Sequence, residues 1–546
     1  MEAQRMDGRL FWELVRGGAA QLKAHANEVN DLNVFPIPDG DTGDNMYLTI
    51  SGGVNREPNG DEPIGSAARR IADGMLLSAR GNSGVILSQF FDGIAAGLSN
   101  AEQADAKLLG SAFQKGVEHS YAAVSEPTEG TILTVAKTAT RYASDASTDS
   151  LNGFFDTFLE RGQTALLETP EQLPVLKKAG VVDSGGAGLL YIIEGMARAL
   201  NGEAPEADEG VQKPAAASLD LDRFTEDSEL TFGYCTELLL RLQTKKTDVD
   251  TFDLNPMREF LQSIGNSLVL VKTGSVVKIH VHMMQPYRVL EYCQRYGEYL
   301  TVKIENMNLQ HNNLPTDSVL VTASERKPIA IVAVASGEGI KHTFREMGAD
   351  DVIDGGQCQN PSTDDFLASF DRVNAETILV LPNNSNVILA AKQAAALYEK
   401  ARVLVVESKT IGDGYAALSM MNPELDDADT IAEDMAMAMD GVVTASVSVC
   451  SRDTEMDGFL LHKGQYIGIS GKEIVSADND RCDTACMLAD RLNFDEHEIC
   501  ILLCGQDSDP DEAQRIAAHI RGAHPFSEVF VQDGGQPVFN YILILE

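Results

Sequence analysis

The sequence is short of positive charge, of cysteine and of long apolar runs, and each shortage excludes a class of protein. Among 546 residues, 43 are lysine or arginine and 82 are aspartate or glutamate, which gives a formal net charge of −39. Such a surface repels phosphate backbones and anionic lipid, so we expect neither nucleic-acid binding nor binding to a membrane surface. It favours a partner with a basic patch, although acidity can also serve solubility alone.

Eight cysteines scattered over so long a chain do not form a disulfide framework. No apolar run approaches the roughly 20 residues that cross a bilayer. The first residues, MEAQRMDGRLFWELVRGG, lack the uninterrupted apolar core of a signal peptide. We therefore expect a soluble cytoplasmic protein with no integral membrane association. The hydrophobic fraction of 44% is typical of a folded globular chain, and the length predicts two to four domains.

The spacing of apolar residues changes along the chain and predicts its organisation. From residue 9 to about 200 they recur at three- and four-residue intervals between glycine-rich breaks, which is typical of a helical bundle with ligand-binding loops at its ends. Strand-rich and then alternating strand and helix patterns follow. The expected division is a helical domain at 1–201, a linker at 202–221, a small α/β domain at 222–312 and a C-terminal α/β domain at 327–546.

Three aspartates crowd onto the short turn PDGDTGDN. Asp39 and Asp41, two apart in an extended turn, present their carboxylates to the same side, and Gly40 and Gly43 let the backbone bend. A hard divalent cation usually stabilises clustered carboxylates, and Mg²⁺ suits them best when water and phosphate oxygens complete its shell. The alternative is an aspartate- and glycine-rich surface turn that caps the following helix.

Two further breaks, ARGNSGV and VVDSGGAG, place glycine and serine at the start of an expected helix. Free backbone amides and a hydroxyl can hold phosphate there, although either break alone can equally be a simple helix cap. Three such loops in one helical domain, one of them rich in aspartate, indicate a metal–nucleotide site. The chain has neither a Walker A motif nor the glycine loop of protein kinases, so the expected scaffold is a helical kinase.

Four segments in this order resemble the nucleotide-binding DhaL domain of dihydroxyacetone kinases: NVFPIPDGDTGDNM, LLSARGNSGVILSQFF, EPTEGTILTV and GVVDSGGAGLLYIIEG. The whole layout resembles the fatty acid kinase catalytic subunit, the FakA-type or YloV-like DhaL fusion proteins. GADDVIDGGQCQNPSTDDFL and LPNNSNVILAAKQAA are similar to the C-terminal region of that family. The implied architecture is multidomain: an N-terminal all-α DhaL-like helical barrel, a small α/β middle domain and a C-terminal α/β DegV-like region.

The resemblance implies that ATP and two Mg²⁺ ions bind at one end of the barrel. Asp39 and Asp41 would be catalytic and, with Asn33, would be the metal ligands. The nucleotide-binding residues would be Thr42, Asn45, Ser83, Gly84, Asp183, Ser184 and Gly185. Asp44 stands where the family usually has threonine, so it either contacts a metal or caps the helix.

The family phosphorylates the carboxylate of a fatty acid that a separate acyl-binding protein presents, which gives an acyl phosphate for phospholipid synthesis. A carboxylate is already ionised at neutral pH, so catalysis needs no general base and rests on positioning and on Mg²⁺. We accordingly interpret His25 and His119 as surface or core residues. The alternatives are a kinase subunit of the dihydroxyacetone type and a non-catalytic regulatory protein that binds nucleotide and lipid.

In the middle domain, VVKIHVHMM places His280 and His282 on one face of an expected strand. With Cys235 from a neighbouring strand they form a three-ligand Zn²⁺ set, the alternative being a purely structural pair of histidines. The family carries a Cys/His/His zinc constellation at matching motifs, so the resemblance favours a structural or regulatory zinc ion whose fourth ligand cannot be named.

The C-terminal strands and loops resemble a DegV-like fold, which binds fatty acids in relatives. In the family's kinases this region is thought to dock the fatty-acid-binding partner protein, and the resemblance also implies a homodimer. Asn360, Ser362, Thr363, Asn383 and Asn384 are either polar cap and turn formers or the lining of a binding groove.

Overall fold

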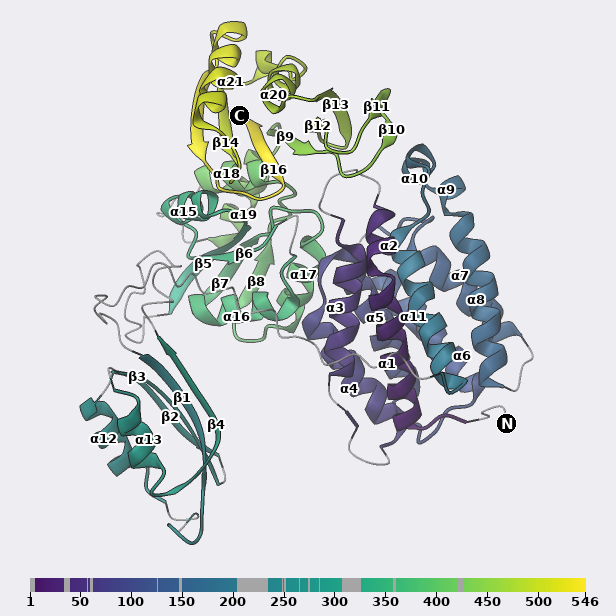
Figure 1. Cartoon of the computed structure of the whole chain (residues 1–546), viewed down its shortest axis with the longest axis vertical. Coiled ribbons are helices and arrows are strands. Elements are labelled where there is room, and N and C mark those ends of the chain that lie inside the picture. Colours follow the sequence, from purple (N-terminus) through teal and green to yellow (C-terminus); the bar gives the residue numbers. More distant parts are fainter. Residues whose placement is uncertain are drawn as a thin grey trace. The chain divides into compact units, whose positions relative to one another are not determined.

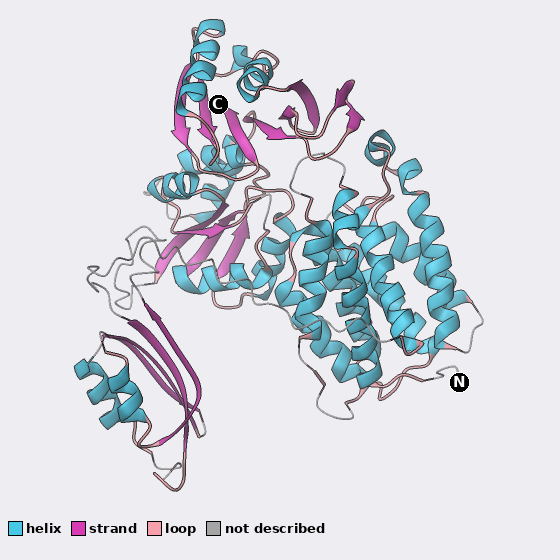
Figure 2. Ribbon diagram, viewed as in Figure 1, coloured by secondary structure: helices cyan, strands magenta, loops and turns pink. Residues whose placement is uncertain are grey.

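The computed structural model places most of the chain in two units, residues Met1–Glu209 with Ser324–Glu546, and residues Gly210–Ala323 (Figure 1). The residues that the structure describes are 5–33, 40–55, 57–58, 62–124, 126–146, 150–203, 234–247, 249, 252–264, 266–273, 275–283, 285–306, 326–356, 360–420 and 427–546. The predicted architecture is confirmed, with helices first and α/β structure in the middle and C-terminal regions (Figure 2).

The N-terminal part of the first unit is helical. Its helices are α1 (Gly8–Ala24), α2 (Ala26–Asp31), α3 (Thr42–Val54), α4 (Ile64–Ser78), α5 (Gly81–Leu98), α6 (Ala106–Ala122), α7 (Ile132–Asp145), α8 (Leu151–Leu167), α9 (Thr169–Gln172), α10 (Pro174–Ala179) and α11 (Ser184–Leu200). The apolar pattern before residue 31 suggests one continuous helix, but the backbone leaves helical geometry at His25 and divides it into α1 and α2.

The core of this helical part comes from the apolar stripes that the sequence pattern marks. Phe90, Phe113, Phe154 and Phe158 lie at its centre, each almost fully buried. Phe113 meets Phe90, Phe154 and Phe158 edge to face, with ring centroids 5.2–5.8 Å apart. Such aromatic pairs stabilise a core by about 0.5–1.5 kcal/mol beyond the burial of their area.

The C-terminal part of the first unit begins with a parallel sheet of order β6-β5-β7-β8. Its elements are β5 (Lys327–Ala335), α15 (Glu338–Glu346), β6 (Asp351–Asp354), α16 (Thr363–Val373), β7 (Ala375–Leu381), α17 (Ile388–Leu397), β8 (Arg402–Val405), α18 (Ile411–Ser419) and α19 (Ala428–Ala438). The inner residues of β5 are buried on both faces, as expected for a strand in a covered parallel sheet.

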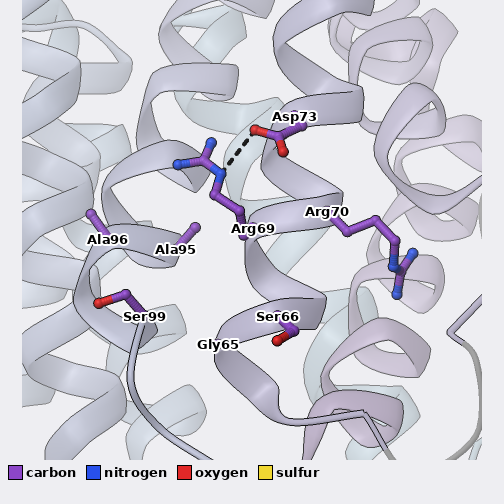
Figure 3. A pocket seen from close by; sticks show the side chains of 8 residues that line it. All are labelled: Gly65, Ser66, Arg69, Arg70, Asp73, Ala95, Ala96 and Ser99. Atoms are coloured by element: carbon purple, nitrogen blue, oxygen red, sulfur yellow. Dashed lines mark hydrogen bonds and ion pairs between the residues drawn. The ribbon is translucent and has the colours of Figure 1, made fainter.

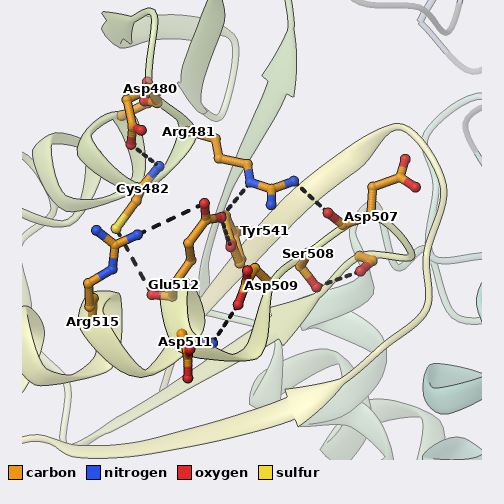
Figure 4. Close-up of polar contacts among 12 residues, drawn as sticks. Asp480, Arg481, Cys482, Asp507, Ser508, Asp509, Asp511, Glu512, Arg515 and Tyr541 are labelled. Atoms are coloured by element: carbon orange, nitrogen blue, oxygen red, sulfur yellow. Dashed lines mark hydrogen bonds and ion pairs between the residues drawn. The ribbon is translucent and has the colours of Figure 1, made fainter.

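A second sheet follows, with six strands in the order β13-β12-β9-β16-β14-β15. Its elements are β9 (Val443–Val449), β12 (Tyr466–Ser470), β13 (Glu473–Asp478), α20 (Arg481–Ala489), β14 (Ile499–Cys504), α21 (Pro510–Ala523), β15 (Glu528–Asp533) and β16 (Phe539–Leu545), with the β10 (Thr454–Met456) and β11 (Phe459–Leu461) hairpin beside it. Glu512 joins the helices to this sheet, because it accepts hydrogen bonds from Arg481 and from the Tyr541 hydroxyl (Figure 4).

The second unit is a four-stranded antiparallel sheet of order β2-β3-β1-β4 with two helices and its own apolar core. Its elements are β1 (Tyr234–Leu242), α12 (Asn255–Ile264), β2 (Asn266–Thr273), β3 (Val276–Met283), α13 (Tyr287–Cys293) and β4 (Gly297–Asn306). Across the described residues of both units, we find no helix that combines the length and the apolar character needed to span a membrane.

Candidate nucleotide and metal site

The N-termini of three helices of the helical part, α3, α5 and α11, meet in one place. The Arg80 backbone N–H, just before α5, donates to Thr49 Oγ1 in the middle of α3 at 3.3 Å, and a β-carbon on Gly81 would lie 2.8 Å from Asn45 Nδ2 in the first turn of α3. The Ser184 hydroxyl at the start of α11 lies 3.4 Å from Thr42 Oγ1 at the start of α3. The loops before α5 and α11, which follow the loop before α3 by about 40 and 140 residues, therefore lie close to it. A shared phosphate site requires this proximity of the three motifs.

Two glycines allow this close approach. A β-carbon on Gly84 would lie 2.4 Å from Thr49 Oγ1, and one on Gly43 would lie 2.4 Å from the Ala26 carbonyl oxygen. Real β-carbons do not approach other atoms so closely, so any larger residue must push α5 or α3 away. Gly81, which opens α5, has a φ of +58°, a conformation that glycine adopts without strain.

The N-cap residues of α3 and α5 provide no side-chain cap, in contrast to that of α11, and in α3 the Gly43 N–H is instead held by Asn30 Oδ1. Neither Asp41 before α3 nor Arg80 before α5 makes a capping hydrogen bond with its side chain. Asp183 Oδ2, by contrast, accepts the Gly186 N–H at 2.7 Å and caps α11. Uncapped amides and the positive end of the helix dipole attract anions, so α3 and α5 are the helices suited to phosphate, with Ser83 and Gly84 in the first turn of α5.

Asp41 lies at the junction of these helices. Its carbonyl accepts the Asn45 N–H at 2.8 Å, which starts α3 and leaves the carboxylate outside the helix. Burial raises the pKa of Asp41 to about 6; a hydrogen bond with the Asn45 side chain opposes the rise, and the nearby negative charge of Asp44 adds to it. A poorly compensated carboxylate beside free phosphate-binding amides suits a hard divalent cation such as Mg²⁺.

Asp44 is held by a residue that the sequence does not single out. Asn30, at the end of α2, donates from Nδ2 to Asp44 Oδ2 at 2.9 Å and accepts the Gly43 N–H on Oδ1 at 2.7 Å. The side chain of Asp44 is exposed and engaged with α2. Of its two sequence-based alternatives, the contacts favour a structural role at the start of α3.

The remaining expected metal ligands are placed only in part. Asp39 lies outside the described residues. Asn33 is half-buried next to Gly40, where a β-carbon on the glycine would lie 3.4 Å from Asn33 Nδ2. The Asn33 carbonyl accepts Nη2 of Arg452 at 2.6 Å, and the same guanidinium binds the Asp31 carbonyl.

Asn360, from the loop before α16, also reaches Asp41. Its Nδ2 donates to Asp41 Oδ2 at 2.6 Å, and its carbonyl accepts Arg80 Nη1 at 3.0 Å. Asn360 Oδ1 is buried without a hydrogen-bond partner among the described residues. The sequence allows Asn360 to be either a turn former or a groove residue, and it does not single out Arg80. The two residues are 280 positions apart and no periodicity connects them.

Of the two alternatives for Ser362 and Thr363, the structure favours cap formers over groove residues. The Ser362 side chain accepts the Asp365 N–H and the Asp365 carboxylate accepts the Ser362 N–H, which forms a capping box at the start of α16. Thr363 is fully buried in the first position of that helix, and its N–H donates to the Ala79 carbonyl at 3.2 Å.

A cavity of about 600 Å³ lies beside the start of α11, lined by residues that include Glu28, Leu159, Val182, Leu190 and Tyr191. Its mixture of apolar walls and carboxylates suits a planar polar ring. The His25 ring stacks on Tyr191 with centroids 4.3 Å apart, and His119 Nδ1 lies 2.8 Å from Asp92. Both histidines have packing or pairing roles in this structure.

A shallow hollow of about 470 Å³ on α4 and α5 is lined by arginines but is a weaker candidate (Figure 3). Arg69 pairs with Asp73 at 2.8 Å and with Asp92 at 2.6 Å, and Arg70 pairs with Glu62 at 3.0 Å. Positive charge that is already neutralised offers little to an anion.

In the second unit, the backbone register places the proposed zinc ligands together. Cys235 of β1 pairs directly with His282 of β3, and His280 is two residues before His282 in the same strand. Residues in these positions share one face of an antiparallel sheet. The side chains of these three residues are not among those that the structure describes, and the described side chains contain no cluster of three or more His, Cys, Asp or Glu that could hold a metal ion.

The fold joins a helical domain to two α/β regions, and comparison with known proteins identifies the family of each part. Residues 36–198 match the DAK2 domain, residues 231–314 match the middle domain of FakA-like fatty acid kinases, and residues 330–546 match the C-terminal domain of the same FakA-like proteins. Protein YloV of Bacillus subtilis is 38% identical over 563 residues, covering 100% of both chains. An uncharacterized Staphylococcus aureus protein is 36% identical over 557 residues, covering 99% of this chain and 100% of its own.

The chain belongs to the FakA-like family of fatty acid kinase proteins. This confirms the family resemblance seen in the sequence, and the DAK2 domain places the chain among nucleotide-binding kinases. Among solved structures, a DegV family protein from Thermus thermophilus, described as binding fatty acid, aligns with 40% of this chain and 99% of its own at 11% identity and a TM-score of 0.31.

Proposed function

We propose that this protein transfers the terminal phosphoryl group of ATP to the carboxylate of a fatty acid. The fatty acid would be presented by a separate acyl-binding protein in the cytoplasm, and the acyl phosphate product would serve phospholipid synthesis. The observation that carries the proposal is the meeting of the N-termini of α3 and α5, neither of which is capped by its own N-cap side chain, beside the partly buried carboxylate of Asp41.

Asp41, with Asp39 and Asn33, would hold Mg²⁺, which when bound neutralises the charge of the phosphoryl groups. The amides at the start of α3 and α5, with Thr42, Asn45, Ser83 and Gly84, would bind the phosphate oxygens. Asp183 caps α11 and the Ser184 hydroxyl lies next to Thr42, which supports Ser184 and Gly185 as the residues that would close the nucleotide site. The cavity of about 600 Å³ beside Tyr191 would take the adenine ring.

The surroundings of the site support a carboxylate acceptor over a hydroxyl acceptor. A hydroxyl must lose a proton during transfer and usually needs a general base, whereas a carboxylate carries no such proton. In the described portion of the helical domain, His25 stacks on Tyr191 and His119 pairs with Asp92, so neither is positioned as that base. This distinction disfavours a dihydroxyacetone-type kinase.

The partner, the assembly and the zinc ion belong to the same proposal. An acidic chain of net charge −39 suits an acyl-binding partner with a basic contact surface. A homodimer, as the family resemblance implies, is checked by sedimentation of the purified chain. A structural or regulatory Zn²⁺ would be held by Cys235, His280 and His282, which the register of β1 and β3 supports.

The decisive experiment follows ATP consumption with a fatty acid and a purified acyl-binding partner, for the wild type and for Asp41→Ala. Hydroxylamine traps any acyl phosphate as a hydroxamate, and dihydroxyacetone in a parallel reaction tests the hydroxyl acceptor. We expect hydroxamate only with the fatty acid and the partner together, and its loss in Asp41→Ala. Equal ATP consumption by the two proteins, or phosphorylation of dihydroxyacetone alone, would refute the proposal.

A further inference from the structure

A second cavity, of about 540 Å³, lies in the C-terminal part at the carboxyl ends of the parallel strands. In the strand order β6-β5-β7-β8, the chain leaves β5 toward β6 on one side and leaves β7 toward β8 on the other side. Val334 and Ser336 at the end of β5 and Asn383 and Asn384 after β7 line the cavity. Ligands of open α/β sheets bind at such a switch point, so we call this space the switch-point cavity.

Three amide side chains that line the switch-point cavity each leave one polar atom unpaired. Asn383 Nδ2 donates to the Val334 carbonyl at 2.9 Å, and Gln536 Nε2 donates to the Leu503 carbonyl at 3.3 Å. Their oxygens, Asn383 Oδ1 and Gln536 Oε1, are buried without a partner among the described residues. In Asn384 the nitrogen is the unpaired atom: Oδ1 accepts the Asn386 N–H at 2.9 Å, and Nδ2 has no partner among the described residues.

These amides are 3–5% exposed, and their orientations are fixed by the bonds that they do make. A buried polar atom without a partner is costly, and native proteins usually leave one only where a ligand or ordered water completes it. The unpaired set consists of two acceptors and one donor. A ligand that fits it therefore carries hydroxyl or amine donors as well as an acceptor.

The described residues that line the cavity include two lysines and no carboxylate, in a chain that is strongly negative. Lys409 and Lys472 line it, both are exposed, and neither has an ion-pair partner in the part of the chain that the structure describes. The first turn of α17, which follows the lining residues Ser385 and Asn386, has no side-chain cap. Two lysines and an uncapped helix N-terminus attract an anionic group.

Apart from the amide side chains and the lysines, much of the cavity wall is apolar. Ile340, Ile411, Phe539 and Ile542 line it, and they come from α15, α18 and β16. Apolar walls with a few convergent polar groups are typical of sites for small organic molecules of this volume. The walls would hold a short carbon skeleton and keep water from the unpaired amides.

We propose that the switch-point cavity binds a small hydroxylated organic anion, a phosphate ester or carboxylate with hydroxyl groups on a short carbon chain. The anionic group lies toward Lys409, Asn384 and the start of α17. The hydroxyl groups lie against the amide side chains of Asn383 and Gln536 that line the cavity. The cavity also reaches Asn33, which the phosphoryl-transfer proposal names as a metal ligand, so the two sites are neighbours. The variants tested below all lie after residue 330, and a loss of phosphoryl transfer would leave the binding result unaffected.

The test is calorimetric titration of the full-length protein with four probes: glycerol 3-phosphate, glycerate, inorganic phosphate and dodecanoate. Asn384→Asp keeps the size and the bond to Asn386 but places a negative charge at the anion position, and Lys409→Gln removes a positive one. The matched control is Lys463→Gln, another exposed lysine of the same region that does not line the cavity. Circular dichroism checks that each variant is folded.

We expect saturable binding of glycerol 3-phosphate or glycerate, tenfold or more weaker in Asn384→Asp and in Lys409→Gln, and unchanged in Lys463→Gln. Preference between the two probes identifies the anionic group. The proposal is overturned if neither binds at millimolar concentration, if inorganic phosphate binds as tightly as the organic probes, if dodecanoate alone binds, or if all three variants bind like the wild type.

Discussion

Gly84 and Thr49 are in such close contact that a β-carbon on the glycine would lie 2.4 Å from the threonine hydroxyl oxygen. That hydroxyl donates to the Asn45 carbonyl at 2.7 Å and accepts the Arg80 N–H at 3.3 Å. The contact therefore holds the start of α5 against the first turns of α3. The spacing of these two helices therefore depends on the absence of a side chain at Gly84.

Gly84→Ala should separate these helix starts. We expect a loss of about 1–3 kcal/mol in stability from overpacking and a tenfold or greater loss of ATP affinity, measured by thermal unfolding and by calorimetry. The matched control is Gly522→Ala in α21, where a β-carbon meets nothing within 4 Å and the change should stabilise by up to about 1 kcal/mol. If Gly84→Ala bound ATP as tightly as the wild type, the phosphates would not bind at the start of α5.

The two described aspartates of the turn should differ in their effect on magnesium. Asp41→Asn removes the carboxylate at the junction of the helices and should lower Mg²⁺-dependent nucleotide affinity by about a hundredfold, equivalent to about 2.7 kcal/mol. Asp44→Asn should change it by less than about threefold, because an amide oxygen there can still accept from Asn30. Similar losses in both variants would make Asp44 a metal ligand.

Asp183 should make stability depend on pH. Burial raises its pKa from 3.8 to about 6, although hydrogen bonds from Gly186 and Ile132 oppose the rise. Between these values the folded state binds more protons than the unfolded state, so stability falls as pH rises, by up to about 3 kcal/mol above pH 6. In Asp183→Asn the side chain stays neutral and this loss should vanish.

Melting temperatures of the wild type and Asp183→Asn, measured at pH 4.5 and pH 7, check this expectation. The advantage of the variant should grow toward pH 7, because the titration of other groups cancels in the difference. Asp105→Asn, at an exposed cap of α6, controls for the loss of a capping carboxylate. A pH-independent difference would mean that Asp183 titrates alike in both states.

The purified full-length chain should contain one zinc ion per molecule by elemental analysis. Cys235→Ser and His282→Asn should each remove most of it, because the two residues face each other in the register of β1 and β3. Cys486→Ser, in α20 of the other unit, should retain the metal. Zinc retained in Cys235→Ser would show that the ligand set is different.

The fold was largely predictable because its signals are local. Helical periodicity before residue 200 and alternating strands and helices after residue 327 follow from the spacing of apolar residues, and the glycine breaks mark the starts of α5 and α11. The break at His25 was not predictable, because the apolar spacing is the same on both sides of it and no glycine or proline marks it.

The candidate site was predictable in its motifs and not in its contacts. Asp41, Ser83 and Ser184 stand out as residue types next to glycine at helix starts. Asn30 and Arg80 do not, because an asparagine at a helix end and an arginine before a helix are ordinary until the chain folds back. The unpaired amides of the switch-point cavity are equally invisible, since satisfaction of a hydrogen bond is a property of the folded state.

The hydrophobic core of the helical part is drawn entirely from Met6 to Met196. It can therefore form while the ribosome is still making the second unit, and domains generally fold in this order during synthesis. The cluster around Phe366 and Phe370, by contrast, includes Ala79 and Val85 of the helical part. The region made after residue 330 thus completes its own interior on a surface that was finished earlier. A defect near Ala79 should therefore impair the maturation of a region that is synthesised more than 200 residues later.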